Sequence, residues 1–440
     1  MQHRVCLNLK VAEGCCKYFK NIMKELSKFE LAAVKRTAQN VSMQRRKKAK
    51  LESKIADLQA ELDMVNTVID SFEAPIIKMS GGFTSEEILN GVLVRRFYSD
   101  PVEPDLHKSY VRQAAPAKKW RHFLYRCRLL KPLSYVKPIW HYKEQEEIKA
   151  LNSQVFYSSS MYAFIRENKA SYRAFIPLSF FPHTYYTALY APEKTILIPT
   201  MHNNGSSFRS IITSVFSEVA YIGFNIEAEQ KLVENIVGKP LAAHGIISVG
   251  IEKTKAADWE QTKVKYNLPE DYLLYVGRID AIKLNNIVDY FLSYKKKYVG
   301  SRLKLVLVGG IFGKTVEHPD IIYTGFVDDA EKVAIQLNAK VIVNPSRYES
   351  LSLILLETMS EGKAMLVNGR CNVLREHCEK SNYAALYYMN RRDFMRKLHN
   401  LENSETLRQQ MGEKGRHYVQ ENYNWEMIIG RMKNVIQMLS

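Results

Sequence analysis

The chain has 440 residues, of which 46% are hydrophobic and 25% are charged, a composition typical of a soluble globular protein with two or three domains. The 63 Lys and Arg residues outnumber the 46 Asp and Glu residues, and the formal net charge of +17 favours anionic partners such as nucleic acid, anionic lipid or phosphorylated substrates. The longest apolar runs stop well short of the roughly 20 residues that a membrane-spanning helix needs, so no such helix is expected.

The six cysteines are scattered and form no CxxC pair or zinc-ligand spacing, so neither a metal site nor a cofactor is expected. Sparse cysteine fits a reducing cytosol, and the first residues lack the apolar core of a signal peptide. We therefore expect a cytoplasmic protein, and peripheral attachment to the inner face of the cell membrane stays open.

Residues 1–75 are predicted to form a helical, coiled-coil region. Apolar residues recur there in alternating steps of four and three, which is the spacing of a coiled-coil seam: Leu51, Ile55, Leu58, Leu62, Val65, Ile69 and Phe72. The alternative is one helix packed on its own domain. The basic run Gln44–Lys50 is interpreted as a solvated helix face, because no nucleic-acid-binding motif accompanies it, and no nucleic-acid partner is expected.

Residues 76–150 are predicted to be a linker that contains one basic amphipathic helix. Prolines recur from residue 101 to residue 138, and Lys118–Lys131 lies between them. This segment mixes cations with Trp120, Phe123 and Leu129, which is typical of a helix at a membrane interface. A basic helix docked on the body of the protein would show the same pattern.

From residue 151 onward, short apolar runs alternate with helical segments, which indicates parallel sheets covered on both faces. The expected strands fall in two series: Gln154–Ser158, Tyr172–Ile176, Lys194–Thr200, Ala220–Phe224 and Gly245–Ile251, then Tyr272–Val276, Leu303–Val308, Ile321–Tyr323, Val341–Val343, Ala364–Val367 and Ala385–Tyr388. We predict an α/β protein with two Rossmann-like domains, a shortened one at residues 151–256 and a second at residues 257–440. Ligands of such sheets lie beyond the carboxyl ends of the strands.

The segment Asn344–Glu357 follows one of these predicted strands and leads into an apolar helix. Backbone N–H groups at the start of that helix form an anion site suited to a diphosphate, and the residues that would supply them are Ser350, Leu351, Ser352 and Leu353. Glu357 lies about two turns into the helix and leans back toward its start, where its carboxylate can accept hydrogen bonds from a ribose. Glu349 precedes the helix and can meet a sugar beyond the phosphates. Considered without the rest of the sequence, these two glutamates could also be ordinary charges on a helix surface.

A second cluster follows the strand Tyr272–Val276. Gly277 permits a tight turn, and Arg278 and Lys283 then lie at the carboxyl end of the strand. Two cations there can hold a diphosphate and stabilise the charge that builds on it as it leaves. Each cation by itself could equally be an ordinary surface charge of a basic protein.

The order Tyr-Val-Gly-Arg-x4-Lys, Leu-Val-Leu-Val-Gly, Tyr-Thr-Gly-Phe-Val and Pro-Ser-x-Tyr-Glu-Ser-Leu-Ser-Leu-x-Leu-Leu-Glu resembles the family-4 retaining glycosyltransferases of GT-B fold, over residues 272 to about 432. The segments Leu366–Cys371 and His377-Cys378 resemble a bacterial subgroup that makes surface polysaccharides. The resemblance implies a nucleotide-sugar donor bound by residues 257–440, retention at the anomeric carbon and no essential metal.

Upstream, the segments Phe175-Ile-Pro, Ile196–His202 and Gly223–Glu229 resemble the second half of the acceptor domain of this family. The resemblance implies that His202, which follows a predicted strand, contacts the sugar. The alternative is a histidine that caps a buried strand end.

Relatives open the acceptor domain with a strand, a glycine-rich loop and a helix. The best candidate for that unit is the segment from Ala74 through Gly81-Gly82 to Ile88, in which a short strand would lead into a capped helix. Asn203-Asn204 replaces the acidic residues that the subgroup has after the histidine, and Leu284 replaces a glycine after Lys283. The acceptor side is therefore expected to be remodelled.

The sequence predicts a glycosyltransferase that moves a sugar from a nucleoside-diphosphate sugar to a glycan hydroxyl, on a glycan that is lipid-linked at the cytosolic membrane face. The alternative is a non-catalytic, glycosyltransferase-like scaffold subunit that assembles through its coiled coil with itself or with a partner.

Overall fold

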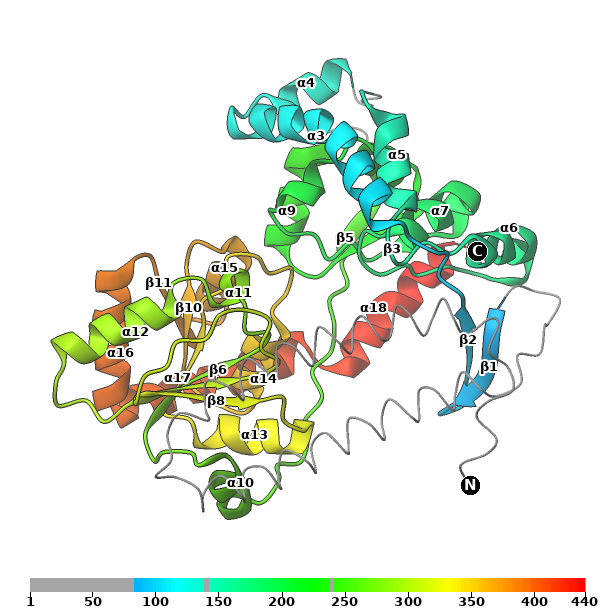
Figure 1. Ribbon diagram of the computed structural model, residues 1–440. Coiled ribbons are helices and arrows are strands. Elements are labelled where there is room, and N and C mark those ends of the chain that lie inside the picture. The colour runs from blue at the N-terminus through cyan, green and yellow to red at the C-terminus, as the bar shows by residue number, and fades with distance from the viewer. Residues whose placement is uncertain (1–82, 138–141, 238–240, 440) are drawn as a thin grey trace, which may run out of the picture. The chain divides into compact units, whose positions relative to one another are not determined.

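The computed structural model describes residues 83–137, 142–237 and 241–439, all within the compact unit Met79–Ser440 (Figure 1). The coiled-coil region predicted for residues 1–75 lies outside these described residues, as do the heptad stripe and the basic run Gln44–Lys50. Within the described residues, no helix combines the length and the apolar character that crossing a membrane requires.

The C-terminal domain is built on a sheet of six parallel strands in the order β11-β10-β9-β6-β7-β8. The strands are β6 (Tyr272–Val276), β7 (Lys304–Val308), β8 (Ile321–Gly325), β9 (Val341–Asn344), β10 (Met365–Asn368) and β11 (Ala385–Tyr388). All six strands predicted from this half of the sequence are confirmed, within two residues at each end. The Rossmann-like fold expected for residues 257–440 is therefore present.

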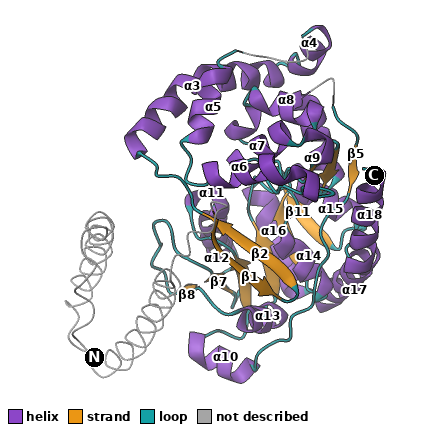
Figure 2. Cartoon of the chain, turned by 90° about the vertical axis from the view of Figure 1, so that its right-hand side faces the viewer, coloured by secondary structure: helices purple, strands orange, loops and turns teal. Residues whose placement is uncertain are grey.

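Alternate residues of these strands face two separate apolar cores, which explains why the strands are apolar on both faces. Tyr272 and Leu274 of β6 belong to one core, whereas Leu273 and Tyr275 belong to the other. The helices that cover the two faces enclose the strands (Figure 2). They are α10 (Trp259–Tyr266), α11 (Ala281–Leu284), α12 (Ile287–Lys297), α13 (Asp329–Asn338), α14 (Leu353–Ser360), α15 (Asn372–Lys380), α16 (Arg391–Asn403) and α17 (Glu405–Asn422).

A smaller parallel sheet forms the centre of the N-terminal domain, with the order β3-β4-β5. Its strands are β3 (Ile196–Leu197), β4 (Tyr221–Phe224) and β5 (His244–Ile246). Two isolated bridges, Phe175 to Thr195 and Leu178 to Ile198, extend this sheet by one short extended segment. The N-terminal domain therefore has a small parallel sheet of three strands among the described residues, and the shortened domain predicted at residues 151–256 stays a prediction.

The strand predicted at Gln154–Ser158 is wrong. This segment is a turn in which the Tyr157 N–H donates to the Gln154 carbonyl, and Ser158 then caps the next helix. Its apolar residues Val155 and Phe156 are 65% and 58% exposed, so their alternation does not mark a buried strand face.

Helices surround this sheet, and the range expected to be a linker contains three of them. The helices are α3 (Pro104–Arg126), α4 (Leu130–Val136), α5 (Glu144–Asn152), α6 (Ser159–Asn168), α7 (Pro182–Tyr190), α8 (Ile211–Glu218) and α9 (Glu227–Val237). Helix α3 runs through Pro116, and Arg121 on its buried face donates hydrogen bonds to Thr213 and to the Ile236 carbonyl at 3.0 and 2.9 Å. The basic helix predicted near Lys118 thus docks on the body of the protein.

The helix predicted for the end of the glycine-rich candidate unit is wrong, because Phe83–Leu89 is strand β1 of a hairpin with β2 (Val92–Phe97). The two strands meet at Asn90 and Gly91, which have φ values of 51° and 80°. Asn-Gly with positive φ at both positions is the preferred two-residue hairpin turn, and this local signal outweighs the helix-starting pattern of Thr84–Ile88.

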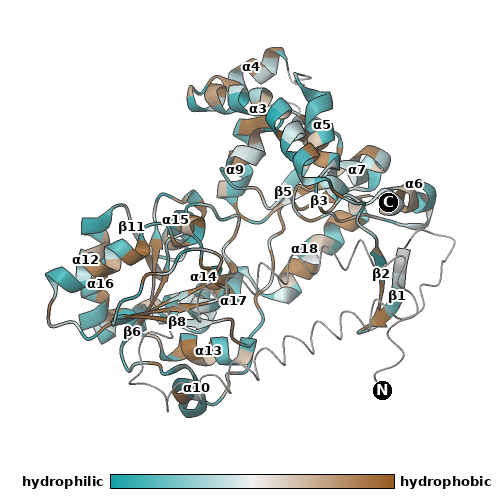
Figure 3. Cartoon of the chain, in the orientation of Figure 1, coloured by the Kyte–Doolittle hydropathy of each residue, from teal (hydrophilic) through white to brown (hydrophobic). Residues whose placement is uncertain are grey.

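The last helix, α18 (Trp425–Met438), follows the C-terminal domain in sequence but packs on the N-terminal sheet (Figure 1). Its residues Ile428 and Val435 share one apolar core with Ile196, Ile198 and Ile247 of that sheet. The apolar colouring of the strands and of one side of α18 is visible in Figure 3. The two Rossmann-like domains are therefore connected by α18 as well as by the segment before α10.

Candidate functional site

The loop between β9 and α14 is held in place by buried polar side chains. The Asn344 amide donates to the Ser352 hydroxyl at 3.0 Å, and the Asn368 amide donates to the Pro345 carbonyl at 2.9 Å. Ser352 is the residue before α14 and adopts a left-handed conformation with φ of 73°, so it does not cap the helix with its side chain. Such strained backbone persists only where the surroundings enforce it, and it is common at binding sites.

His377 fixes the same loop from α15. Its Nε2 lies 2.8 Å from the Leu351 carbonyl, which can only accept, so Nε2 carries the proton and Nδ1 is left to accept from the Tyr418 hydroxyl at 3.1 Å. Complete burial lowers the pKa of His377 to about 4, so the ring is neutral at physiological pH.

Backbone N–H groups at the start of α14 are available to a ligand. Among the described residues, no group accepts a hydrogen bond from the N–H groups of residues 350–353. Unsatisfied N–H groups at a helix start attract anions. The diphosphate role predicted for Ser350, Leu351, Ser352 and Leu353 stays a prediction, and this geometry is compatible with it.

The turn after β6 brings Lys283 to Glu349. Asp280 accepts hydrogen bonds from the N–H groups of Ile282 and Lys283 and thereby starts α11. The Lys283 ammonium then lies 3.0 Å from a Glu349 carboxylate oxygen. Arg278 pairs with Asp280, and its side chain stays 55% exposed.

Gly277 makes this turn possible. Its φ is 146°, and a Cβ at Gly309 after β7 would lie 2.1 Å from the Gly277 carbonyl oxygen. The close approach of the two strand ends therefore requires glycine at position 309, whereas glycine at position 277 permits the positive φ of the turn.

His202 lies in the loop after β3 and reaches the same place from the N-terminal domain. Its Nδ1 is 3.4 Å from the Thr200 carbonyl, and its Nε2 accepts from the Asn204 amide at 3.0 Å. Burial lowers the pKa of His202, and the nearby Lys283 cation lowers it further, so the imidazole is neutral at pH 7. A neutral imidazole can both donate and accept hydrogen bonds with sugar hydroxyls.

The buried carboxyl of Glu229 on α9 supports the His202 loop. The Met201 and Asn225 N–H groups donate to its two oxygens, and the Asn225 amide adds a bond at 3.0 Å. Burial raises the pKa of Glu229 to about 8 despite these three donors. Glu229 ends a segment that carries the resemblance, but no role was predicted for it, because a glutamate near a helix start looks like an ordinary surface charge.

His202, Glu229 and Glu349 are among the residues that line a cavity of about 350 Å³. His202 and Glu349 line it from the two domains, and the His202 and Tyr348 rings are 6.3 Å apart. Arg347 and Arg370, which sequence reasoning missed, also line it and add positive charge. The cavity lies beyond the carboxyl ends of β3, β9 and β10, where ligands of parallel sheets bind.

Glu357, Arg278 and Lys283 do not line this cavity, although Lys283 forms an ion pair with Glu349, which does line it. A Glu357 carboxylate oxygen lies 3.5 Å from the Lys332 ammonium of α13, which also contacts Asp329 at 3.1 Å. Lys332 was not predicted, because no motif in the sequence connects α13 to α14. The structure therefore unites His202, Lys283 and Glu349 and places Glu357 in a separate ion pair.

Residues 258–418 match the family model described as glycosyl transferases group 1. The matched residues lie in the C-terminal domain and make up less than half of the chain. The curated proteins include no sequence match. The match does not distinguish family 4, or the surface-polysaccharide subgroup, within this broader group of glycosyltransferases.

Solved structures with the same fold are GT-B glycosyltransferases. A structure described as trehalose-6-phosphate from E. coli bound with UDP-2-fluoro glucose is 10% identical, with a TM-score of 0.57, and the match covers 81% of this chain and 90% of that one. The α,α-trehalose 6-phosphate synthase of Burkholderia multivorans is 12% identical, with a TM-score of 0.53 and coverage of 82% and 88%. The sucrose-phosphate synthase of Thermosynechococcus elongatus is 16% identical, with a TM-score of 0.50 and coverage of 64% and 77%. At these identities the likeness shows the GT-B fold alone, as the sequence predicts.

Proposed function

We propose that this protein is a retaining glycosyltransferase that moves a sugar from a nucleoside-diphosphate sugar to a glycan hydroxyl in surface polysaccharide synthesis. The observation that carries the proposal is that His202 from one domain and Glu349 from the other line one cavity, while Lys283 forms an ion pair with Glu349. The enzyme would act in the cytoplasm, at the inner face of the cell membrane.

The cations and the start of α14 would bind the donor diphosphate. Arg278 and Lys283 would exchange their present carboxylate partners, Asp280 and Glu349, for phosphate oxygens. As the bond to the sugar breaks, negative charge grows on the diphosphate, and these fixed positive groups would stabilise it. No side-chain nucleophile is required.

Glu349 and His202 would hold the transferred sugar from opposite sides. Release of Lys283 toward the diphosphate would free the Glu349 carboxylate to accept hydrogen bonds from sugar hydroxyls. The neutral imidazole of His202 would contact the sugar from the N-terminal domain. Glu357 would accept hydrogen bonds from the ribose in place of its present partner Lys332.

A non-catalytic scaffold subunit is the second candidate. The small size of the sheet β3-β4-β5 favours it, because a reduced acceptor domain offers less surface to a second substrate. In this alternative the C-terminal domain would still bind nucleotide, and the segment 1–75 would assemble a synthesis complex as a coiled coil.

Calorimetric titration with a panel of nucleoside diphosphates and their sugars tests the donor site. Glu357→Ala should weaken binding by about 1.5–3 kcal/mol for each charge-assisted hydrogen bond that is lost to the ribose. Asp329→Ala is the matched control, because it removes the other carboxylate that contacts Lys332. Unchanged affinity in a folded Glu357→Ala protein would remove Glu357 from the site.

A further inference from the structure

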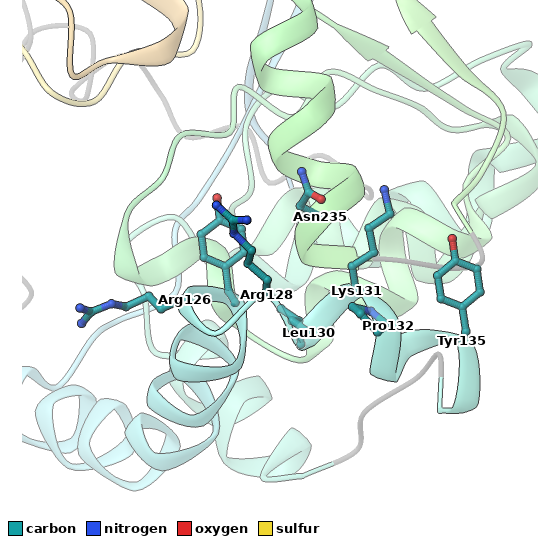
Figure 4. Close-up of a pocket in the computed structure, with 8 residues that line it drawn as sticks. Arg126, Arg128, Leu130, Lys131, Pro132, Tyr135 and Asn235 are labelled. Atoms are coloured by element: carbon teal, nitrogen blue, oxygen red, sulfur yellow. The ribbon is translucent and has the colours of Figure 1, made fainter.

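A basic hollow of about 780 Å³ lies outside the cavity described above, between the end of α3, the start of α4 and α9. Its polar lining consists of Tyr125, Arg126, Arg128, Lys131, Tyr135 and Asn235. Figure 4 shows Arg128 and Lys131 on either side of Asn235, whereas Arg126 points away from it. The hollow therefore presents two long cations beside an amide.

Within the described part of the chain, the side chains of Arg126, Arg128 and Lys131 have no ion-pair or hydrogen-bond partner. Three neighbouring unpaired cations in a chain of net charge +17 create a local positive field that attracts anions. The ligand that fits this lining is an anion with several oxygen acceptors, such as a phosphate.

Exposed apolar side chains are present on α3 and α4 outside the lining of the hollow. Trp120 and Phe123 are 50% and 54% exposed and stack with ring centroids 5.7 Å apart, and Leu133 and Val136 on α4 are 38% and 86% exposed. Figure 3 shows hydrophilic and hydrophobic residues interleaved along α3 and α4. Exposed aromatic and aliphatic side chains mixed with cations suit the interface of an anionic lipid layer.

A polar groove joins the hollow to the cavity. Lys231 and Arg375 line it from α9 and α15, and Tyr125 and Asn235 line both the groove and the hollow. At the other end, Ala228 and Asn372 line both the groove and the cavity that contains His202 and Glu349. The groove follows one face of α9 from residue 228 to residue 235, which is about 10 Å at 1.5 Å per residue. This length fits a short oligosaccharide.

We propose that the acceptor is a phosphate-bearing, lipid-linked glycan. Its phosphate binds in the hollow beside Arg128 and Lys131 while the α3–α4 surface rests on an anionic lipid layer. Its glycan follows the groove along α9, so that its terminal hydroxyl reaches the cavity. The choice of acceptor rests on the proposed function, whereas the binding of the hollow to an anionic lipid surface can be tested by itself.

Vesicle sedimentation tests the lipid surface. The native protein should sediment with vesicles of phosphatidylglycerol and phosphatidylcholine in equal parts, and not with phosphatidylcholine alone. Arg128→Glu combined with Lys131→Glu should weaken this binding by about 30-fold or more. Lys296→Glu combined with Lys297→Glu, which makes the same charge change on exposed residues of α12, should leave it unchanged.

The proposal would be overturned if the Arg128→Glu, Lys131→Glu variant bound the anionic vesicles as well as the native protein does. It would also be overturned if the native protein bound neutral vesicles as well as anionic ones. Calorimetry with pyrophosphate on the native protein and on the Arg128→Glu, Lys131→Glu variant distinguishes the sources of phosphate. Pyrophosphate binding that this variant loses, in a protein that does not bind vesicles, would assign the hollow to a free anion and also overturn the proposal. Nucleotide titration of the native protein reports on the proposed function separately.

Asn235→Trp tests the groove, because a large ring there would obstruct the passage between hollow and groove. Sugar transfer to a membrane extract should fall at least 10-fold while vesicle binding persists. Gln409→Trp, on an exposed face of α17, is the control. Undiminished transfer by Asn235→Trp would show that the acceptor takes another route.

Discussion

At the scale of single residues, the site depends on groups that are neutral although they can carry a charge. His377 is neutral because it is buried, and only the neutral ring can donate to Leu351 while it accepts from Tyr418. Protonation would remove the acceptor at Nδ1 and place a charge inside the core. The loop that carries Glu349 is therefore expected to become less stable in acid.

The pH dependence of stability tests this expectation. In the unfolded chain His377 becomes protonated below its ordinary pKa of about 6.5, whereas in the folded protein it resists protonation until about pH 4. The stability that this residue contributes is therefore lost as the pH falls from about 6.5 to about 4. The difference in unfolding free energy between the native protein and His377→Gln should therefore shrink by about 2 kcal/mol from pH 7 to pH 5. Urea unfolding at both pH values measures it, and a constant difference would contradict the argument.

At the scale of secondary-structure elements, α18 is the helix whose position the sequence conceals. Its sequence predicts an amphipathic helix start at Asn424 and Trp425, but nothing local to it indicates that it packs on the sheet of the other domain. The apolar core that it shares with Ile196 and Ile247 stabilises the N-terminal sheet, which has only three strands in the described residues.

Paired alanine substitutions on α18 test this packing. Ile428 is 4% exposed in the shared core, so Ile428→Ala should lower the free energy of unfolding by about 2–5 kcal/mol. The adjacent Ile429 is 46% exposed, and Ile429→Ala should cost under about 1 kcal/mol. Similar losses from the two variants in urea unfolding would argue against α18 as the support of the N-terminal sheet.

The elements that the sequence predicts well are those with strong local signals. The strands β6 to β11 are short, apolar on both faces and bounded by turns, so each is recognisable alone. The N-terminal domain was harder to predict. Gln154–Ser158 has strand-like composition but little burial, and β1 follows a hairpin turn that competes with a helix start.

The residues of the site divide in the same way, into those that a sequence motif identifies and those that only the folded structure identifies. Lys283 and Glu349 belong to motifs that a resemblance can identify, and the structure places them 3.0 Å apart. Lys332 lies in no motif, and Glu229 and Arg370 lie in segments that the resemblance covers without assigning them a role. The contribution of all three depends on contacts between elements distant in sequence. Such contacts arise only when the chain folds, so residue type and spacing do not predict them.

At the scale of the whole molecule, the segment 1–75 is predicted to determine assembly. The stripe from Leu51 to Phe72 keeps the four-three spacing of an intermolecular coiled coil. Deletion of residues 1–73 should therefore lower the oligomeric state measured by light scattering, and Leu58→Glu combined with Leu62→Glu should do the same in the full chain. If the number of chains per particle stays the same after these changes, the stripe belongs to a helix packed within one chain.

Catalysis also belongs to the whole molecule, because it requires both domains at one sugar. His202 is one of the N-terminal residues that line the cavity together with Glu349. A contact that matters most as charge develops lowers turnover far more than ground-state binding when it is removed. A scaffold subunit would need neither the contact nor the closed cavity.

The release of nucleoside diphosphate from a panel of nucleotide sugars, with and without a membrane extract as acceptor, tests the central claim most directly. The native protein should hydrolyse its proper donor slowly even without acceptor. His202→Ala should lower turnover by about 100-fold with little change in nucleotide affinity, whereas His417→Ala, on an exposed position of α17, should have no effect. No release from any donor by the native protein, even with the membrane extract, would contradict the assignment as an enzyme.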